Sequence, residues 1–210
     1  MEANFWHERW ETNEIGFHQE KANALMVANF DRMALRDGAR VFVPLCGKTL
    51  DIAWLLTRGY RVCGAELSEI AIQQLFEGLG TPPEVTQVGP LKRYSATAID
   101  IYVGDIFDLD AGTLGQVDGV YDRAALVALP GEMRERYAAH MMTITNYAPQ
   151  FLLCFEYDQS VMPGPPFSIA PEVVLDLYAA NYEVAPVASA PFAGKLKGIA
   201  DAMEVAWHVT

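Results

Sequence analysis

Residues 40–66, RVFVPLCGKTLDIAWLLTRGYRVCGAE, decide the fold of this chain. The stretch opens with a β-rich run, Arg40–Leu45, turns at Gly47 and continues as a helical segment that ends near Gly59. A second β-rich run, Arg61–Glu66, follows directly. A strand, a helix and a second strand joined by short turns form a βαβ unit, in which the two strands lie parallel in one sheet.

The same alternation of strands and helices continues along the rest of the chain. Further β-rich runs predict strands at residues 99–103, 119–121, 151–156, 183–188 and 203–209. Helical patterns predict helices within residues 4–18, 21–38, 68–79, 130–144 and 171–180. We therefore predict a Rossmann-like α/β fold with a mostly parallel seven-stranded sheet, helices on both faces and an antiparallel hairpin at one edge. Residues 82–98 are expected to be an irregular excursion, in which Gly89-Pro90 suits the turn of a hairpin.

Bulk composition indicates a globular protein that acts on small molecules. The chain has 210 residues with no internal repeat and no Ser/Gly-rich linker, so we expect a single domain over residues 1–210. Its net charge of −12 argues against nucleic acid and anionic membrane surfaces as partners, because both attract Lys and Arg. No apolar run approaches the roughly 20 residues needed to cross a bilayer, and Met1–Phe5 lacks a signal-peptide pattern. We expect a cytoplasmic monomer.

Metal binding is not expected from the cysteine and histidine pattern. Cys46, Cys63 and Cys154 lie in apolar, strand-like runs and are interpreted as buried free thiols. Their spacing suits no zinc site, and the histidines are scattered along the chain.

Candidate ligand-binding residues follow the predicted strands, at the edge where open α/β sheets bind their ligands. Gly47 permits a sharp turn and close approach of a ligand, although a lone glycine also fits an ordinary turn. Glu66 ends the second strand about 20 residues later, where nucleotide-binding folds of this type place an acid. Its carboxylate can accept hydrogen bonds from both ribose hydroxyls, or it can cap the helix that begins at Ser68.

Two further strand ends carry polar side chains whose roles stay open. Asp105 is placed to accept a hydrogen bond from an adenine amino group, with Ile106 against the ring, but Gly104-Asp105 also fits a turn. Arg123 follows Asp122 and faces the same cleft, where its guanidinium can bind a carboxylate or an electron-rich substrate. Structural pairing with Asp122 or another acid is the alternative.

The N-terminal segment is rich in aromatic residues. Trp6 and Trp10 lie four residues apart and share one face of a short helix. They are interpreted either as core residues or as part of a lid, formed by residues 1–20, that covers an aromatic ligand. Phe17-His18 extends that lid.

Seven short motifs occur in order along nearly the whole chain. They are Phe5-Trp6-His7-Glu8-Arg9-Trp10, Gly16-Phe17-His18-Gln19, Phe42-Val43-Pro44-Leu45-Cys46-Gly47-Lys48-Thr49-Leu50-Asp51, Gly64-Ala65-Glu66-Leu67-Ser68, Gly104-Asp105-Ile106-Phe107-Asp108, Tyr121-Asp122-Arg123-Ala124-Ala125-Leu126 and Gly164-Pro165-Pro166-Phe167. Together they resemble the thiopurine S-methyltransferase family. The Pro-Leu-Cys-Gly-Lys turn and the early Trp-x-x-x-Trp are distinctive of that family, and the length resembles its bacterial members.

The resemblance implies a class I methyltransferase fold that uses S-adenosylmethionine (AdoMet) and releases S-adenosylhomocysteine (AdoHcy). The acceptors it implies are aromatic and heterocyclic thiols such as thiopurines, and in some bacterial members selenium or tellurium compounds. The family's cofactor contacts carry over onto Trp10 near the methionine part, the backbone of Leu45, Glu66 at the ribose and Asp105–Ile106 beside the adenine. Arg123 is implied to lie where cofactor and acceptor meet.

Arg123 is also the predicted catalytic residue. Methyl transfer from a sulfonium is an in-line displacement, so most of the catalysis should come from positioning. A heterocyclic thiol is already acidic, which makes a dedicated strong base unnecessary. We predict that Arg123 steers and stabilises the thiolate by charge and hydrogen bonding.

One segment departs from the family pattern. Residues 193–198 match poorly where family members often place an arginine near the acceptor, and either Lys195 or Lys197 is a candidate to supply that charge. Two alternatives to a methyltransferase are weighed. An NAD(P)-dependent oxidoreductase lacks support because residues 46–50 hold one glycine and not the G-x-G-x-x-G turn. A non-enzymatic protein that sequesters AdoMet or a metalloid compound is the other.

Overall fold

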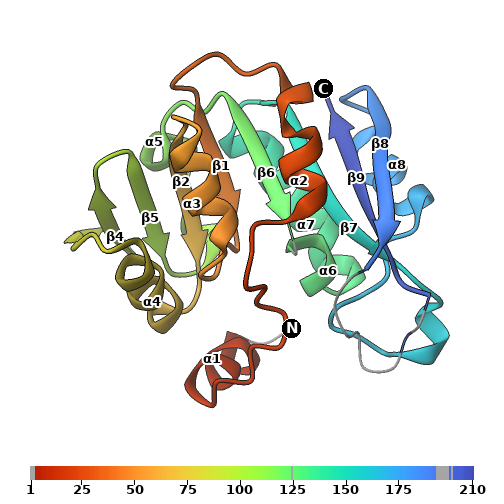
Figure 1. The fold of residues 1–210 in the computed structure, drawn as a ribbon, viewed down its shortest axis with the longest axis horizontal. Coiled ribbons are helices and arrows are strands. Elements are labelled where there is room, and N and C mark those ends of the chain that lie inside the picture. The colour runs from red at the N-terminus through yellow and green to blue at the C-terminus, as the bar shows by residue number, and fades with distance from the viewer. Residues whose placement is uncertain (1–2, 124, 193–198, 200) are drawn as a thin grey trace.

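The structure is a computed structural model that describes residues 3–123, 125–192, 199 and 201–210. Within these residues nine strands form one sheet, in the order β3-β4-β5-β2-β1-β6-β7-β9-β8 (Figure 1). The strands are β1 (Arg40–Pro44), β2 (Arg61–Glu66), β3 (Glu84–Val88), β4 (Leu91–Ala96), β5 (Ile99–Val103), β6 (Gly119–Arg123), β7 (Gln150–Glu156), β8 (Val184–Pro191) and β9 (Met203–Val209).

The centre of the sheet is parallel, as the βαβ pattern predicts. β5, β2, β1, β6 and β7 are parallel neighbours, so their carboxyl ends meet at one edge. β9 pairs antiparallel with both β7 and β8, which confirms the predicted hairpin at that side of the sheet.

The prediction of seven strands is wrong, because the expected irregular excursion at residues 82–98 forms a hairpin. β3 pairs antiparallel with β4, and β4 pairs antiparallel with β5. The turn lies at Gly89-Pro90, between the paired residues Val88 and Leu91. β3 is exposed along nearly its whole length, so it lacks the alternation of apolar and polar residues that reveals a half-buried strand.

Helices cover both faces of the sheet. They are α1 (Ala3–Glu11), α2 (Ala24–Asn29), α3 (Leu50–Thr57), α4 (Glu69–Leu79), α5 (Ala111–Leu114), α6 (Ala125–Ala128), α7 (Gly131–Ile144) and α8 (Pro171–Tyr178), with 3-10 turns η1 (Phe30–Met33), η2 (Ile106–Asp108) and η3 (Gln159–Val161). α2, α3 and α4 pack against one face, and α5, α7 and α8 pack against the other (Figure 1). In the described part of the chain, no helix combines the length and the apolar character needed to cross a membrane.

The helix expected over residues 21–38 is much shorter. Asn23 starts α2 by accepting a hydrogen bond from the backbone N–H of Met26. The backbone then tightens into η1 and leaves the helix at Ala34, which has a positive φ of 49°. The helix therefore ends well before residue 38, although Met26 and Phe30 are fully buried as expected for its apolar face.

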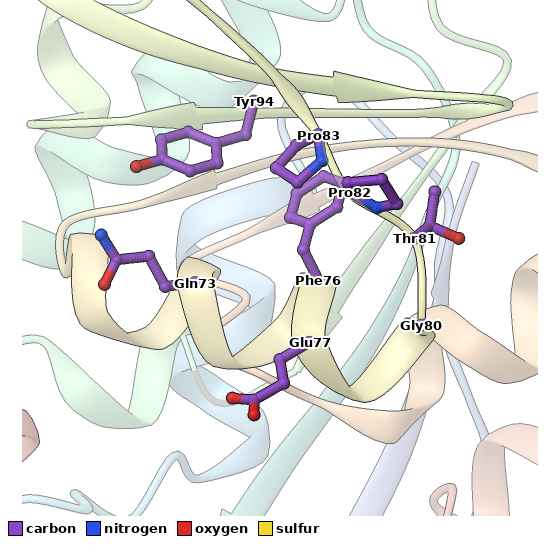
Figure 2. Close-up of a pocket in the computed structure, with 8 residues that line it drawn as sticks. All are labelled: Gln73, Phe76, Glu77, Gly80, Thr81, Pro82, Pro83 and Tyr94. Carbon is purple, nitrogen blue, oxygen red and sulfur yellow. The ribbon is translucent and has the colours of Figure 1, made fainter.

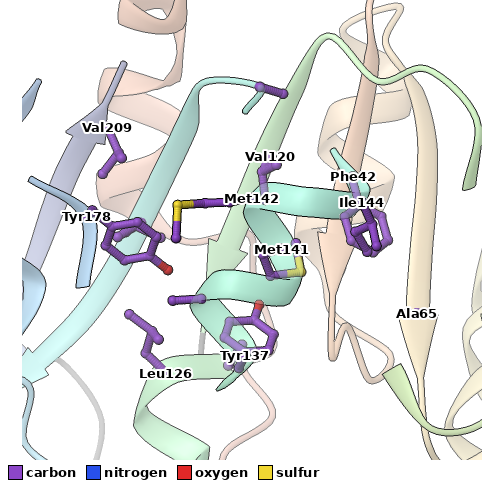
Figure 3. Close-up of a cluster of buried hydrophobic side chains, with 14 of the residues drawn as sticks. Phe42, Ala65, Val120, Leu126, Tyr137, Met141, Met142, Ile144, Tyr178 and Val209 are labelled. Atoms are coloured by element: carbon purple, nitrogen blue, oxygen red, sulfur yellow. The ribbon is translucent and has the colours of Figure 1, made fainter. Parts of the chain in front are cut away.

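The larger hydrophobic core lies between the sheet and α7. Figure 3 shows Tyr137 and Met141 of α7 in this core, with Phe42 of β1, Val120 of β6 and Tyr178 of α8. All five side chains are buried, and Phe42, Val120 and Met141 each contribute about 1.5–3 kcal/mol to stability by leaving water. This packing holds the strands whose ends form the site.

The three cysteines are buried and free, as predicted. Burial raises the pKa of the Cys63 thiol to about 12, and it raises the pKa values of the other two well above their ordinary value. The thiols are therefore protonated and unreactive at neutral pH.

A shallow hollow lies on the outside of the β3–β4 hairpin. It has a volume of about 330 Å³ and lies between the carboxyl-terminal half of α4 and the Pro82-Pro83 segment, with Tyr94 of β4 at one side (Figure 2). It is remote from the strand ends and shares no lining residue with the cavity described next.

Candidate functional site

The carboxyl ends of β1, β2, β5 and β6 open into a cavity of about 440 Å³. α1 lies beyond the arrowheads of β1 and β6 and closes one side of this cavity (Figure 1). All the residues that the sequence singles out for ligand binding line it: Trp10, Leu45, Glu66, Asp105, Ile106 and Arg123. The structure thus brings the four predicted strand ends together, while the ligand role of each residue stays a prediction.

Glu66 organises the turn after β1. Its Oε2 accepts a hydrogen bond of 2.7 Å from the N–H of Gly47, and its Oε1 accepts one of 2.9 Å from the N–H of Ser68. Leu45 and Gly47 both have positive φ, 46° and 51°, so this turn has an unusual shape that the carboxylate stabilises. Ser68, not Glu66, caps α4, by accepting a hydrogen bond from Ala71 N–H.

Glu66 is also a buried acid. Burial raises the pKa of its carboxyl, and the backbone N–H donors of Ser68 and Gly47 lower it in part. Carboxylate oxygens have about four lone-pair sites, so two backbone donors leave acceptor capacity for a ligand diol.

Two features favour glycine at position 47: its positive φ and the close approach of the Trp10 ring. A Cβ at this position would lie 3.2 Å from Cζ2 of Trp10, which packs over the turn. Trp10 is only 4 % exposed, and the Lys48 ammonium lies 5.9 Å from its ring centroid. The ring and the glycine together form one wall of the cavity.

The end of β5 is a turn, as one of the two open interpretations predicts. Asp105 Oδ1 accepts a hydrogen bond of 3.0 Å from the N–H of Phe107 and starts η2. The carbonyl of Ile106 lies 2.8 Å from Nε2 of His140 on α7, which fixes this turn from the other face. Ile106 is half-buried at the cavity, a placement that leaves its adenine role open.

Arg123 pairs with an acid that the sequence analysis did not single out. Its Nη1 donates hydrogen bonds to Asp51 Oδ2 at 3.1 Å and to Thr49 Oγ1 at 3.2 Å. Asp122 instead accepts a hydrogen bond of 2.7 Å from the hydroxyl of Tyr137 on the opposite face of the sheet. Burial lowers the pKa of Arg123, but Asp51, Tyr121 and Glu204 together raise it by more, so the guanidinium stays charged.

Asp51 could have been suspected from its position. It lies within the Pro-Leu-Cys-Gly-Lys-Thr-Leu-Asp motif, one residue after the start of α3. An acid on the apolar face of a short helix is unusual, because buried carboxylates are almost always paired. Sequence alone gives no partner for it.

The aromatic N-terminal segment packs as one cluster against the cavity. The Phe17 ring lies edge-to-face with Trp6 at 5.8 Å and with Trp10 at 5.7 Å between centroids. Trp6 and Trp10 therefore share a helix face as predicted, and all three residues line the cavity. Whether this segment opens and closes as a lid stays a prediction.

Apolar side chains from later in the chain also line the cavity. Phe155 of β7 and Phe192 pack edge-to-face at 4.7 Å, beside Pro165 and Pro166. Of these, sequence analysis noted only the proline motif. Lys195 and Lys197, the other candidates near the acceptor, lie outside the described residues.

His18 supplies a neutral polar group at the same cavity. It is half-buried, and burial, followed by the charges of Lys48 and Arg123, lowers its pKa. Across the described residues, no cluster of three or more His, Cys, Asp or Glu side chains is arranged to hold a metal ion.

Comparison with known proteins identifies relatives over the full length. A family model described as thiopurine S-methyltransferase matches residues 1–202. A thiopurine S-methyltransferase of Xanthobacter autotrophicus is 58% identical over 208 residues, 99% of this chain and 98% of that protein. One from Teredinibacter turnerae is 46% identical over 210 residues, 100% of this chain and 98% of that protein.

Solved structures with much lower identity share the fold. An AdoMet-dependent methyltransferase from Anabaena variabilis superposes with a TM-score of 0.68 at 14% identity, covering 99% of this chain and 94% of that chain. A 1,6-didemethyltoxoflavin-N1-methyltransferase from Burkholderia thailandensis, solved with S-adenosylhomocysteine, gives a TM-score of 0.67 at 17% identity, covering 99% and 86%. These likenesses confirm the predicted methyltransferase fold.

Proposed function

Since this chain belongs to the thiopurine S-methyltransferase family, we propose that it transfers a methyl group from AdoMet to the sulfur of an aromatic or heterocyclic thiol. One observation carries the proposal beyond family membership. Residues from four strand ends and from α1 surround a single cavity, whose lining includes a buried acid, Glu66, and a largely buried cation, Arg123.

The cavity has the features that AdoMet would require. Glu66 offers a carboxylate to a ribose diol, and the turn at Leu45–Gly47 brings backbone close to the ligand without a side chain in the way. Trp10 would pack beside the methionine part, and Asp105–Ile106 would lie beside the adenine. AdoMet, when bound, supplies a methyl group activated by its sulfonium.

The methyl acceptor would occupy the part of the cavity that is lined by apolar side chains. Phe155, Phe192, Pro165 and Pro166 form walls suited to a flat ring, and burial against them excludes water. Arg123 would lie at the boundary between the two parts and stabilise the thiolate by charge and hydrogen bonding. Alignment of the sulfur with the methyl group would then supply most of the rate enhancement.

The two alternatives have less support. An NAD(P)-dependent oxidoreductase would need a glycine-rich turn after β1, and this turn has one glycine, whose Cβ position is filled by Trp10. A protein that binds AdoMet without turnover would keep the same cavity, so activity is the measurement that separates it.

The test is AdoMet-dependent methylation of 6-mercaptopurine, with the product identified by mass and a reaction without AdoMet as control. We expect S-methylated product. Selenium and tellurium compounds form the second acceptor panel. AdoHcy binding with no methyl product from either panel would favour the sequestering protein. Absence of AdoHcy binding would remove the cofactor assignment itself.

A further inference from the structure

Asp51 lies at the meeting point of three segments beneath the cavity. It is fully buried, and each of its carboxylate oxygens accepts a hydrogen bond. Oδ1 accepts one of 2.7 Å from the N–H of Asn23, which precedes α2. Oδ2 accepts from the Tyr121 hydroxyl at 2.8 Å and from Arg123 Nη1 at 3.1 Å, both on β6.

This carboxylate has a high energetic cost that its partners must offset. Removing a carboxylate from water is strongly unfavourable unless it is paired with a cation and hydrogen-bonded. Asp51 has both, yet it does not line the cavity and so cannot contact a ligand there. Its effect on a bound molecule must pass through its partners that line the cavity, Tyr121 and Arg123, of which only Arg123 carries charge.

The hydrogen bonds hold one edge of the guanidinium and leave another edge available. Nη1 takes both protein acceptors, Asp51 and Thr49, and Nε is shielded from solvent. Nη2 has no acceptor among the described residues. The arginine side chain is long and flexible. Hydrogen bonds from Nη1 restrain it, so that Nη2 stays in a fixed place.

We infer that Asp51 is a positioning residue for the methyl-transfer step, which fixes Arg123 through Nη1 so that Nη2 meets the acceptor thiolate. This inference rests on the proposed function, because it assigns the acceptor as the group that Arg123 stabilises. Preorganised charge is effective in catalysis because it does not have to move during the reaction.

A second buried acid provides a matched control. Glu204 of β9 is also buried and also bonds to Asn23, whose Nδ2 lies 2.8 and 2.9 Å from its two oxygens. It has no hydrogen bond to Arg123. Asp51→Asn and Glu204→Gln therefore make the same change, acid to amide, in one network, and only the first removes an anchor from the guanidinium.

The first experiment measures kcat and KM for 6-mercaptopurine at saturating AdoMet, together with AdoHcy affinity. We expect Asp51→Asn to lower kcat about 10- to 100-fold, the range of one charge-assisted hydrogen bond, with AdoHcy affinity within about threefold. The pH profile of kcat should shift to higher pH, because a loosely held cation stabilises the thiolate less. Glu204→Gln should stay within about threefold of wild type in kcat, with an unshifted profile.

A double-mutant cycle separates positioning from general damage to the fold. In an Arg123→Ala background, Asp51→Asn should cause no further loss of kcat, because the residue through which it acts is absent. Equal losses in both backgrounds would overturn the inference. If Asp51→Asn does not fold, Thr49→Val removes the other Nη1 acceptor. This variant should also lower kcat while AdoHcy affinity is retained, and it should shift the pH profile of kcat, both by smaller amounts. An unshifted pH profile in that variant would also overturn the inference.

An NMR measurement keeps the inference distinct from the proposed function. The Nε–H resonance of Arg123, identified by its loss in Arg123→Lys, should exchange slowly with water in wild type and in Glu204→Gln, and rapidly in Asp51→Asn. Wild-type protein that methylates no thiol would defeat the proposed function while this result still showed the anchoring. Slow exchange in Asp51→Asn would defeat the anchoring whatever the activity.

Discussion

Glu66 and Gly47 are joined across the sheet by a hydrogen bond of 2.7 Å, from the backbone N–H of the glycine to Oε2 of the acid. The acid at the end of β2 therefore has two tasks, since it holds the turn after β1 in shape and faces the cavity to which that turn contributes. Removing the charge of Glu66 should therefore loosen the turn after β1 and weaken ligand binding in the cavity.

Glu66→Gln should reduce AdoHcy affinity by about 10- to 100-fold, because a charged acceptor is replaced by a neutral one that can donate as well as accept. Isothermal titration calorimetry measures the change. Glu69→Gln is the matched control, since Glu69 is an acid three residues away that pairs on the surface with Lys92 at 2.7 Å. Equal affinities for both variants would contradict a ribose role for Glu66.

The same carboxyl predicts a pH dependence of cofactor binding. Burial raises the pKa of Glu66, so the free protein protonates this group at a higher pH than an exposed acid would. AdoHcy affinity should fall as the pH is lowered through that raised pKa, and Glu66→Gln should remove this dependence. An identical acid-side decline in wild type and variant would assign the decline to another group.

Arg123→Ala should destabilise the fold as well as lower kcat. The substitution leaves Asp51 buried without its cation, and breaking a buried ion pair by removing one partner costs about 3–5 kcal/mol. Urea denaturation measures the loss. Arg123→Ala combined with Asp51→Asn should recover most of it, and a double variant no more stable than Arg123→Ala would show that the pair contributes little.

Asp122 should make the native protein less stable as the pH rises. Burial raises its pKa from 3.8 to about 6, with the Tyr137 hydroxyl offsetting part of that rise. The native state therefore holds a proton that the unfolded state releases between about pH 4 and 6, and stability falls across this window. About two pKa units correspond to about 3 kcal/mol.

The measurement compares Asp122→Asn with wild type by denaturation at several pH values. The variant lacks the titrating group, so its unfolding free energy relative to wild type should increase by about 3 kcal/mol from pH 4 to pH 7. Asp176→Asn, which alters an exposed acid of α8, is the control and should follow wild type. A constant difference between Asp122→Asn and wild type would place the Asp122 pKa near its ordinary value.

The aromatic cluster should report ligand binding by fluorescence. Trp6 and Trp10 line the cavity, whereas Trp54 and Trp207 lie elsewhere. AdoHcy should change emission and quencher access in wild type and in Trp54→Phe, and the change should be much smaller when Trp6 and Trp10 are both replaced by Phe. Unaltered emission and quenching in wild type on saturation with AdoHcy would argue against a lid.

Sequence patterns predicted the part of the fold that is buried and locally encoded. The βαβ unit of residues 40–66 has strong apolar strands and a capped helix, and it appears in the structure as expected. For residues 82–98 the turn of a hairpin was recognised at Gly89-Pro90, but β3 was not counted as a strand because nearly all of its residues face solvent and show no alternation of apolar and polar residues. The helix over 21–38 was predicted too long because the backbone leaves helical geometry at Ala34, a non-glycine residue with a positive φ, which the sequence pattern does not reveal.

The sequence predicts which strand-end residues meet at the site, but not the hydrogen bonds that join them to other parts of the chain. Strand ends of a parallel sheet meet at one edge, so Glu66, Asp105 and Arg123 could be placed together from the strand pattern alone. The hydrogen-bond partners of Asp51 could not be predicted from the strand pattern, because Asn23, Tyr121 and Arg123 lie 28, 70 and 72 residues away in sequence. No periodicity links residues at such separations.

The place of β9 in the sheet has a consequence for biosynthesis. β9 comes last in sequence but lies between β7 and β8, and it also carries Glu204, the acceptor for the Asn23 side chain. A nascent chain that has emerged only as far as β8 thus has two unpaired strand edges and an unanchored segment ahead of α2. A premature stop before residue 203 would leave these edges unpaired, so it would yield an aggregation-prone product, not a smaller enzyme.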